Sequence, residues 1–77
     1  MMLKIKTVSG KVIEIEVDSE DTVKELKQRI EEVERIPPVQ QKLIFNGAIF
    51  TNDEKKLGDY NLKNGNVVHM VLALRGG

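Results

Sequence analysis

One stretch of this 77-residue sequence has the apolar spacing of a long helix, and it limits the folds that the chain can adopt. Thr22 and Glu25 have the spacing of a capping box, which favours a helix that begins at Val23. The residues that then recur on one helical face are Val23, Leu26 and Ile30, flanked by Val33 or Lys27. Pro37 and Pro38 end the pattern, because a residue before proline avoids the α conformation. We therefore predict one amphipathic helix that packs on a sheet.

Five other stretches have the alternation of β-strands. Leu3 and Ile5 share one face of the first stretch, and lysines share the other. Gly10 marks a turn after it, and Asn46-Gly47 has the composition of a two-residue hairpin turn. The predicted strands are residues 1–7, 12–17, 42–45, 48–50 and 67–72.

The order of these elements is strand, strand, helix, strand, short strand, strand. This order predicts an α+β protein with one helix packed across a mixed sheet. A hairpin at each end with the helix between them is typical of a β-grasp fold. We expect the last strand to lie beside the first, in the middle of the sheet. The predicted domain covers residues 1–72, and residues 73–77 form a flexible, extended tail that the central strand anchors.

Composition argues against several classes of function. The 12 basic and 12 acidic residues cancel, which argues against nucleic acids and membranes as partners. No apolar run approaches the ~18 residues of a membrane span, and the N-terminus lacks the apolar core of a signal peptide. The chain has no cysteine, so it forms no disulfide, and a reducing intracellular compartment is the simplest setting.

Catalytic constellations are also missing from the sequence. His69 is the only histidine and there is no cysteine, which excludes Cys/His catalysis and clustered zinc ligands. Glu31 and Glu32 are adjacent, so their carboxylates diverge on a helix. Turns explain each glycine before the C-terminus, and no phosphate-binding glycine loop is present. We therefore predict that the protein is not an enzyme and has no catalytic residue, metal ion or cofactor of its own.

The C-terminus, in contrast, has a composition suited to acyl chemistry. Its last six residues are Leu72, Ala73, Leu74, Arg75, Gly76 and Gly77. The leucines and the arginine offer side chains for recognition, whereas the glycines let a partner approach the backbone closely. From Ala73 onward the extended chain would span roughly 17 Å, enough to reach into a partner's active site. The alternatives are a Gly-Gly scar left by cloning or a frayed end, and the neighbouring Leu-Ala-Leu-Arg favours a function.

The second candidate site is an apolar patch on the sheet. On the last strand Val68, Met70 and Leu72 alternate with Val67, His69 and Val71. If the first set lies in the core, His69 and Val71 stand on the open face. Ile44 joins them because Leu43 points inward, and Val8 lies at the neighbouring turn. Scattered exposed aliphatic residues are ordinary, whereas an apolar patch ringed by lysines suggests a docking face.

The sequence resembles the ubiquitin family from end to end, with one extra residue near Thr51. The matching motifs are Lys6-Thr7 followed by Gly10-Lys11, Ile36-Pro37-Pro38, Gln40-Gln41-Lys42-Leu43-Ile44-Phe45 followed by Gly47, Asp59-Tyr60-Asn61, and Leu74-Arg75-Gly76-Gly77. The resemblance implies a β-grasp fold and covalent attachment through Gly77, with residues 72–76 recognised by activating enzymes and proteases. The recognition patch that it implies consists of Val8, Ile44, His69 and Val71, with Ile36, Leu72 and Leu74 as a second patch.

Within that family the sequence is closer to the class that modifies cullins (the Rub or Nedd class) than to ubiquitin. Ubiquitin has arginine where this chain has Ala73, and the cullin modifier has alanine. Further matches to the cullin modifier are Lys4, Glu14, Glu31, Glu32 and residues 52–55. Arg35 replaces the family's glycine after the helix, at a cost of roughly 1 kcal/mol if the left-handed cap is kept. Ala48 replaces a lysine used for chain building. The candidate acceptor lysines that remain are Lys6, Lys11 and Lys27.

The function that the resemblance implies is that of a protein tag. An activating enzyme adenylates the Gly77 carboxylate with ATP and holds it as a thioester. A conjugating enzyme then passes it to a lysine of a cullin, which activates a cullin-RING ubiquitin ligase, and deconjugating proteases remove it. The free protein is expected to be a monomer in the cytoplasm and nucleus.

Three alternatives remain open. They are ubiquitin itself or a divergent ubiquitin, a β-grasp sulfur carrier with a C-terminal thiocarboxylate, and a non-covalent module cut from a larger protein. The sulfur carrier needs no recognition patch, and the Ile-Pro-Pro and Gln-Gln-Lys-Leu-Ile-Phe runs argue against it.

Overall fold

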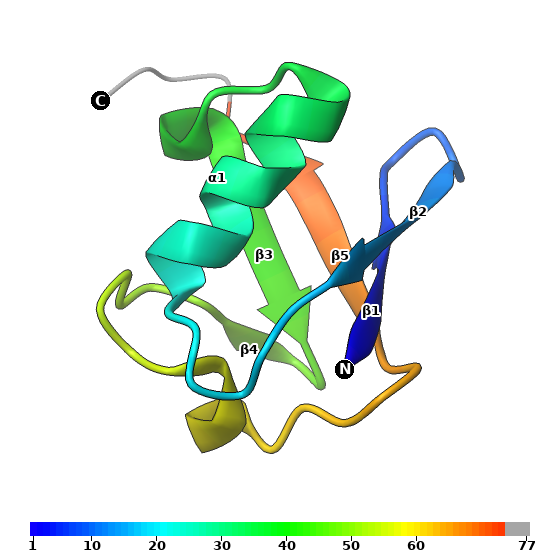
Figure 1. The fold of residues 1–77 in the computed structure, drawn as a ribbon. Coiled ribbons are helices and arrows are strands. Elements are labelled where there is room, and N and C mark those ends of the chain that lie inside the picture. Colours follow the sequence, from blue (N-terminus) through cyan, green and yellow to red (C-terminus); the bar gives the residue numbers. More distant parts are fainter. Residues whose placement is uncertain (74–77) are drawn as a thin grey trace.

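The structure, a computed structural model, describes residues 1–73 and consists of one long helix packed across a five-stranded sheet (Figure 1). Its elements are β1 (Met2–Lys6), β2 (Val12–Glu16), α1 (Val23–Glu34), the 3₁₀ turn η1 (Pro38–Gln40), β3 (Gln41–Phe45), β4 (Ala48–Ile49), the 3₁₀ turn η2 (Leu57–Tyr60) and β5 (Val67–Leu72). This arrangement is a β-grasp, so the predicted fold is confirmed. The predicted flexible tail falls mainly on residues 74–77, which lie outside the described residues.

The sheet is mixed, with the strand order β2-β1-β5-β3-β4. β5 runs parallel to β1 and antiparallel to β3, so the last strand lies in the middle of the sheet, as predicted (Figure 1). Val68 of β5 lies beside Ile5 of β1. Met70, two residues further, lies beside Leu43 of β3, and all four side chains are buried. The hairpins β1-β2 and β3-β4 flank this centre on either side.

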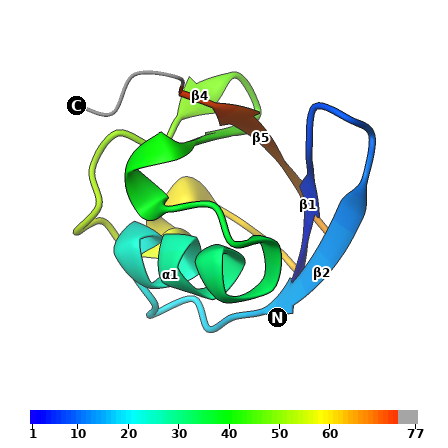
Figure 2. The same cartoon turned by 90° about the horizontal axis from the view of Figure 1, so that it is seen from above.

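Helix α1 lies across one face of the sheet (Figure 2). Its fully buried residues are the predicted Val23, Leu26 and Ile30. Of the two residues expected beside this stripe, Lys27 takes the sheltered position, because its side chain is 12% exposed and its ammonium lies 3.0 Å from the Asp53 carboxylate. Val33 is 57% exposed, so the core does not use it.

The start of α1 has the predicted capping box. Thr22 Oγ1 accepts a hydrogen bond from the Glu25 amide at 3.2 Å, and the Thr22 amide donates to Glu25 Oε1 at 2.9 Å. The first two amides of the helix donate to the backbone carbonyls of Lys55 and Asp53, at 3.0 Å each. The polar loop at residues 51–56 therefore satisfies helix amides that would otherwise lack partners.

The loop between β2 and α1 is held by Asp21. Its carboxylate accepts hydrogen bonds from the Asp18 amide at 2.9 Å and from Arg29 Nη1 at 2.5 Å. The Asp18 amide, followed by the Arg29 guanidinium, lowers the pKa of Asp21 below its ordinary value. The stability that this carboxylate contributes is therefore present above its ordinary pKa and is lost as the pH falls through the lowered pKa.

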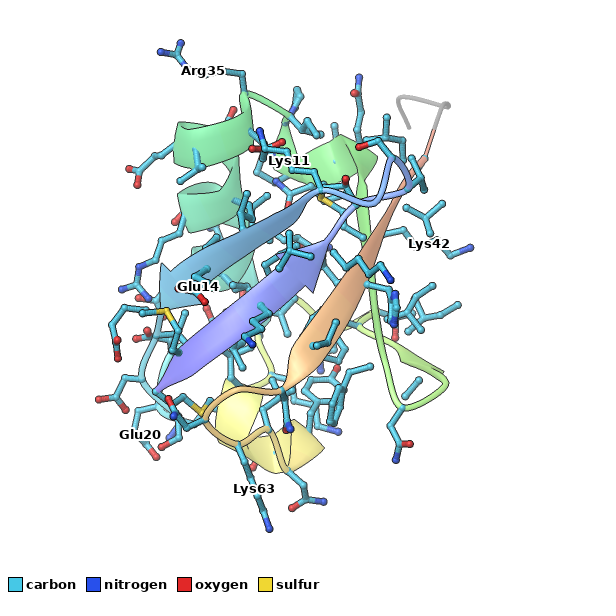
Figure 3. The ribbon with its side chains drawn as sticks, turned by 90° about the vertical axis from the view of Figure 1, so that its right-hand side faces the viewer. Lys11, Glu14, Glu20, Arg35, Lys42 and Lys63 are labelled. Carbon is cyan, nitrogen blue, oxygen red and sulfur yellow. The ribbon has the colours of Figure 1, made fainter. Side chains whose placement is uncertain are left out.

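Arg35 ends α1 in the left-handed conformation, with φ 61° and ψ 28°. Its amide donates to the Glu31 carbonyl at 2.8 Å, which satisfies one of the free carbonyls at the end of the helix. A side chain in this conformation costs about 1–2 kcal/mol, because Cβ approaches a carbonyl oxygen. The Arg35 side chain projects from the end of the helix (Figure 3), and it forms no ion pair within residues 1–73 that would offset this cost.

We predict that Arg35→Gly stabilises the fold, because glycine adopts positive φ without this steric cost. The free energy of unfolding, measured by urea denaturation, should rise by roughly 1 kcal/mol. Glu31→Gly, inside the same helix, is the control and should lower it by about 1 kcal/mol. A loss of stability in both variants would contradict the strain at Arg35.

A second prediction tests the register of β3, in which Leu43 is fully buried and Ile44 is half-buried on the opposite face. Leu43→Ala should cost about 2–5 kcal/mol, because it leaves a cavity in the core. Ile44→Ala should cost less than about 1 kcal/mol, because the core stays intact. Chemical denaturation of both variants measures the difference, and the reverse order would mean that the register is shifted by one residue.

Candidate recognition surfaces and conjugation tail

The predicted tail begins where β5 ends, beside the start of β3. Leu72 lies opposite Gln41, and the Ala73 amide donates to the Gln40 carbonyl at 2.8 Å. Backbone hydrogen bonds therefore hold the chain as far as Ala73. The other residues of the predicted tail, Leu74, Arg75, Gly76 and Gly77, lie outside the described residues.

A buried glutamine holds the surroundings of this junction. Gln41 is 4% exposed, and its Nε2 donates to the backbone carbonyls of Lys27 at 2.8 Å and Ile36 at 2.9 Å. These bonds tie the start of β3 to α1 and to the segment that follows α1. Oε1 of Gln41 is buried without a donor among residues 1–73. Sequence reasoning gave Gln41 no role, because a polar residue at the start of a strand carries no signal of burial.

The open face of the sheet brings three of the predicted patch residues together. His69 of β5 lies between Lys6 of β1 and Ile44 of β3 in the strand register. Val71 lies two residues beyond His69, opposite Lys42, and is 37% exposed. Figure 3 shows this face, with Lys42 labelled. Ile44, His69 and Val71 therefore form one surface, called here the open-face surface, with a lysine on either side.

The open-face surface includes one residue that the sequence analysis did not name. Ile49 of β4 pairs with Ile44 and is 44% exposed. Val67 of β5, which alternation placed on the same face as His69, is 38% exposed. Phe50 is buried, so the alternation of a strand places its neighbour Ile49 on the outer side. This signal was present in the sequence, but it was not used.

Val8 and Ile36 belong to a second surface, a groove of about 240 Å³ between the β1-β2 turn, the end of α1 and the end of β5. Its apolar lining is Val8, Ile36, Met70 and Leu72, and its polar lining is Thr7, Ser9 and Glu34. The structure thus groups Val8 with Ile36 and Leu72, whereas the sequence suggested a place for Val8 beside Ile44. Leu74, also expected in this second patch, lies outside the described residues.

The candidate acceptor lysines differ in their surroundings. Lys6 is exposed and forms no ion pair within residues 1–73. Lys11 is also exposed, but its ammonium lies 2.9 Å from the Glu34 carboxylate. Lys27 is sheltered in its ion pair at the side of α1. Lys63, which the sequence analysis did not select, is exposed in the turn before β5 (Figure 3).

The described part of the chain offers surfaces rather than a reaction centre. Within residues 1–73 no group of three or more histidine, aspartate or glutamate side chains is arranged to hold a metal ion. The helices of this part are all too short or too polar to cross a membrane. Two apolar surfaces beside exposed lysines suit protein recognition.

Comparison with known proteins gives a consistent relationship. The sequence model of the ubiquitin family matches residues 3–75. The chain is 49% identical over 77 residues to the ubiquitin-like protein NEDD8 of Dictyostelium discoideum, covering 100% of this chain and 99% of that protein. Over all of this chain it is 47% identical to the NEDD8-like protein RUB3 of Arabidopsis thaliana and 44% identical to the NEDD8-like protein RUB1 of Saccharomyces cerevisiae, covering 97% and 99% of those proteins.

These matches extend over the whole chain, and the β-grasp fold agrees with them. They confirm the predicted resemblance to the Rub or Nedd class. The family consists of protein modifiers and not of enzymes, which confirms that this protein is not an enzyme. The chain belongs to the ubiquitin family and is a ubiquitin-like modifier similar to NEDD8.

Proposed function

We propose that this protein is conjugated through the carboxylate of Gly77 to lysines of target proteins, mainly cullins, and thereby activates cullin-RING ubiquitin ligases. The junction at Ala73 is the observation that carries the proposal. A strand paired on both sides in the centre of the sheet leads directly into a C-terminus with the sequence Leu-Arg-Gly-Gly. The groove of Val8, Ile36 and Leu72 adjoins this junction, so one enzyme can hold the body and the tail together.

The chemistry requires enzymes that act in turn. An activating enzyme joins the Gly77 carboxylate to the AMP part of ATP and releases pyrophosphate. A cysteine thiolate then displaces AMP, and this sulfur must belong to the enzyme because the chain has no cysteine. A conjugating enzyme takes the acyl group onto its own cysteine, and the amine of a target lysine displaces that thiolate to form an isopeptide bond. Gly76 and Gly77 favour each attack because no side chain crowds the carbonyl.

The two surfaces suit different partners. The groove adjoins the end of β5, from which the tail begins at Ala73, so it suits activating enzymes and deconjugating proteases that must read residues 72–77. The open-face surface lies on the outer face of the sheet and combines an apolar centre with a lysine on either side. It suits a cullin-RING ligase or another protein that offers an apolar side chain with carboxylates around it.

Cullins are chosen as targets because the chain is similar to NEDD8 and NEDD8-like proteins over its full length. Ala73 supports the same choice, because ubiquitin has arginine at the matching position. A short neutral side chain fits an apolar or basic wall of an activating enzyme, whereas arginine requires a carboxylate partner. Ala73 would therefore decide which activating enzyme accepts the chain.

We predict that deleting Gly76 and Gly77 abolishes conjugation and leaves the fold intact. The shortened chain ends at Arg75, whose carboxylate falls short of the adenylation site and stands beside a bulky side chain. Thioester formation with a NEDD8-activating enzyme and ATP, assayed on non-reducing gels, measures the loss. Thermal unfolding of the same variant checks the fold, and a thioester on the shortened chain would contradict the proposal.

We further predict that Ala73→Arg lowers activation by a NEDD8-activating enzyme and raises activation by a ubiquitin-activating enzyme. The added guanidinium loses its hydration against an apolar or basic wall but gains a partner where the enzyme offers a carboxylate. The ratio of the two kcat/KM values should change at least tenfold, or about 1.4 kcal/mol. Ala73→Gln is the control for side-chain size without charge. An unchanged ratio would mean that another part of the chain selects the enzyme.

For chains of several copies, we propose Lys6 and Lys11 as acceptors before Lys27, because the side chains of Lys6 and Lys11 are exposed whereas that of Lys27 is sheltered within its ion pair. An acetylating reagent should modify Lys6 at least about tenfold faster than Lys27. A tenfold difference in rate corresponds to about 1.4 kcal/mol of protection at Lys27. Mass spectrometry of peptides measures the rates. Asp53→Asn should raise the rate at Lys27 alone, and equal rates for the three lysines would contradict the order.

A further inference from the structure

The chain contains two Asn-Gly pairs, both in turns, at residues 46–47 and 64–65. Asparagine before glycine is especially prone to deamidation, because glycine has no side chain to hinder attack by its backbone nitrogen. All four residues are exposed, and both glycines have positive φ, 80° at Gly47 and 88° at Gly65. Exposure and composition therefore do not distinguish the two pairs, whereas their hydrogen bonds do.

Both reacting groups of the second pair are bound to β1. Oδ1 of Asn64 accepts a hydrogen bond from the Met2 amide at 2.7 Å. The Gly65 amide donates to the Met2 carbonyl, also at 2.7 Å. The attacking nitrogen must lose its proton and the carboxamide must turn toward it, so both bonds have to break before the reaction can begin. The contacts with Met2 therefore protect Asn64.

The first pair lacks such restraints. Neither the Asn46 carboxamide nor the Gly47 amide forms a hydrogen bond within residues 1–73. The space beside Gly47 is also open, because no atom of this part of the chain lies within 4 Å of the position that a Cβ would take there. Water and base can therefore reach the Gly47 nitrogen.

The turn must still rotate before the two groups can meet. Asn46 is in the left-handed conformation, with φ 53°, which directs its side chain away from the next backbone nitrogen. β4, which follows the turn, has only two residues, Ala48 and Ile49, and both are exposed. Short segments with few buried contacts open locally at a low free energy. β1, which holds Asn64, is instead paired with both β2 and β5.

We propose that Asn46 is a site of spontaneous deamidation and that Asn64 is protected from it. The Gly47 nitrogen loses its proton and attacks Cγ of Asn46. The new N–Cγ bond closes a succinimide ring, the Cγ–Nδ2 bond breaks, and the nitrogen leaves as ammonia with the proton. Water then opens the ring. Attack on Cγ restores the backbone and gives aspartate, whereas attack on the backbone carbonyl carbon of Asn46 gives isoaspartate, in which the main chain runs through Cγ.

Either product places a carboxylate at the end of the open-face surface. The turn joins β3 to β4 at the margin of the sheet, next to the pair of Ile44 and Ile49 (Figure 1). Two residues of extended chain separate Asn46 from Ile44, or about 7 Å, which is within the Debye length of about 8 Å at physiological salt. Isoaspartate also lengthens the main chain in a two-residue hairpin turn, whose geometry sets the pairing of its strands.

The test ages the full folded chain in mildly alkaline buffer and digests it with trypsin, which places the two pairs on different peptides, residues 43–55 and 64–75. Mass spectrometry should show deamidation at Asn46 at least about tenfold faster than at Asn64, because two hydrogen bonds must first break at Asn64. Fragment ions separate Asn46 from Asn52, which lies on the same peptide. The unaged chain, digested in the same way, gives the background.

Unfolding removes the hydrogen bonds to Met2 and is the control for sequence alone. In concentrated urea the rates at Asn46 and Asn64 should become similar. Equal rates in the folded chain, or a ratio of rates that urea leaves unchanged, would overturn the proposal. A folded chain in which Asn46 stays intact, although it reacts in urea, would overturn it as well.

Variants then identify the products. Asn46→Gln should form no acidic species at this position, because attack on a glutamine side chain has to close a larger ring. Asn46→Asp should elute with one of the two aged products on anion exchange and match its ¹⁵N NMR spectrum. The isoaspartate product should shift the amides of Ile44 and Ile49 further, since it also lengthens the turn. Unchanged amides of Ile44 and Ile49 in both products would refute the effect on the open-face surface.

Discussion

The insertion of β5 between β1 and β3 is the interaction on which the rest of the structure depends. Without it the sheet would consist of two separate hairpins, and an isolated two-stranded hairpin is marginally stable in water. The pairing places Val67 beside Lys4 and therefore closes a loop that contains nearly the whole chain. Closing this loop costs conformational entropy, and that cost is offset only when the core forms at the same time. Val68 and Met70, both buried, supply the middle of this core under α1.

The same insertion positions the recognition surfaces. β5 is buried on one face through Val68 and Met70 and presents His69 and Val71 on the other, so one strand builds both the core and the open-face surface. Its far end forms one wall of the groove and is paired with β3 up to the Ala73 amide. A partner that binds the groove therefore contacts the packed domain, and the tail begins at Ala73, a fixed position relative to that groove.

Most of the fold was predictable because its signals are local. The capping box at Thr22, the positive φ of Asn46 and Gly47 in the β3-β4 turn, and the alternation of β5 each depend on neighbours within a few residues. Alternation also predicted that Leu43 is buried and that Ile44, His69 and Val71 share a face. The parallel pairing of the first and last strands followed from the order of elements and not from any single residue.

The sequence by itself therefore determined the elements, the direction of most side chains and the chemistry of the C-terminus, because periodicity and turn composition act through short-range geometry. Only the tertiary structure decided which neighbours cover each side chain. It sheltered the side chain of Lys27 and left that of Val33 exposed. It also buried Gln41 between α1 and β3 and placed Val8 in one groove with Ile36 and Leu72. In the same way it left the outer edge of β2 unpaired within residues 1–73, at Glu14. These outcomes depend on contacts between residues far apart in the chain, and a periodic pattern shows where a side chain points but not what it meets.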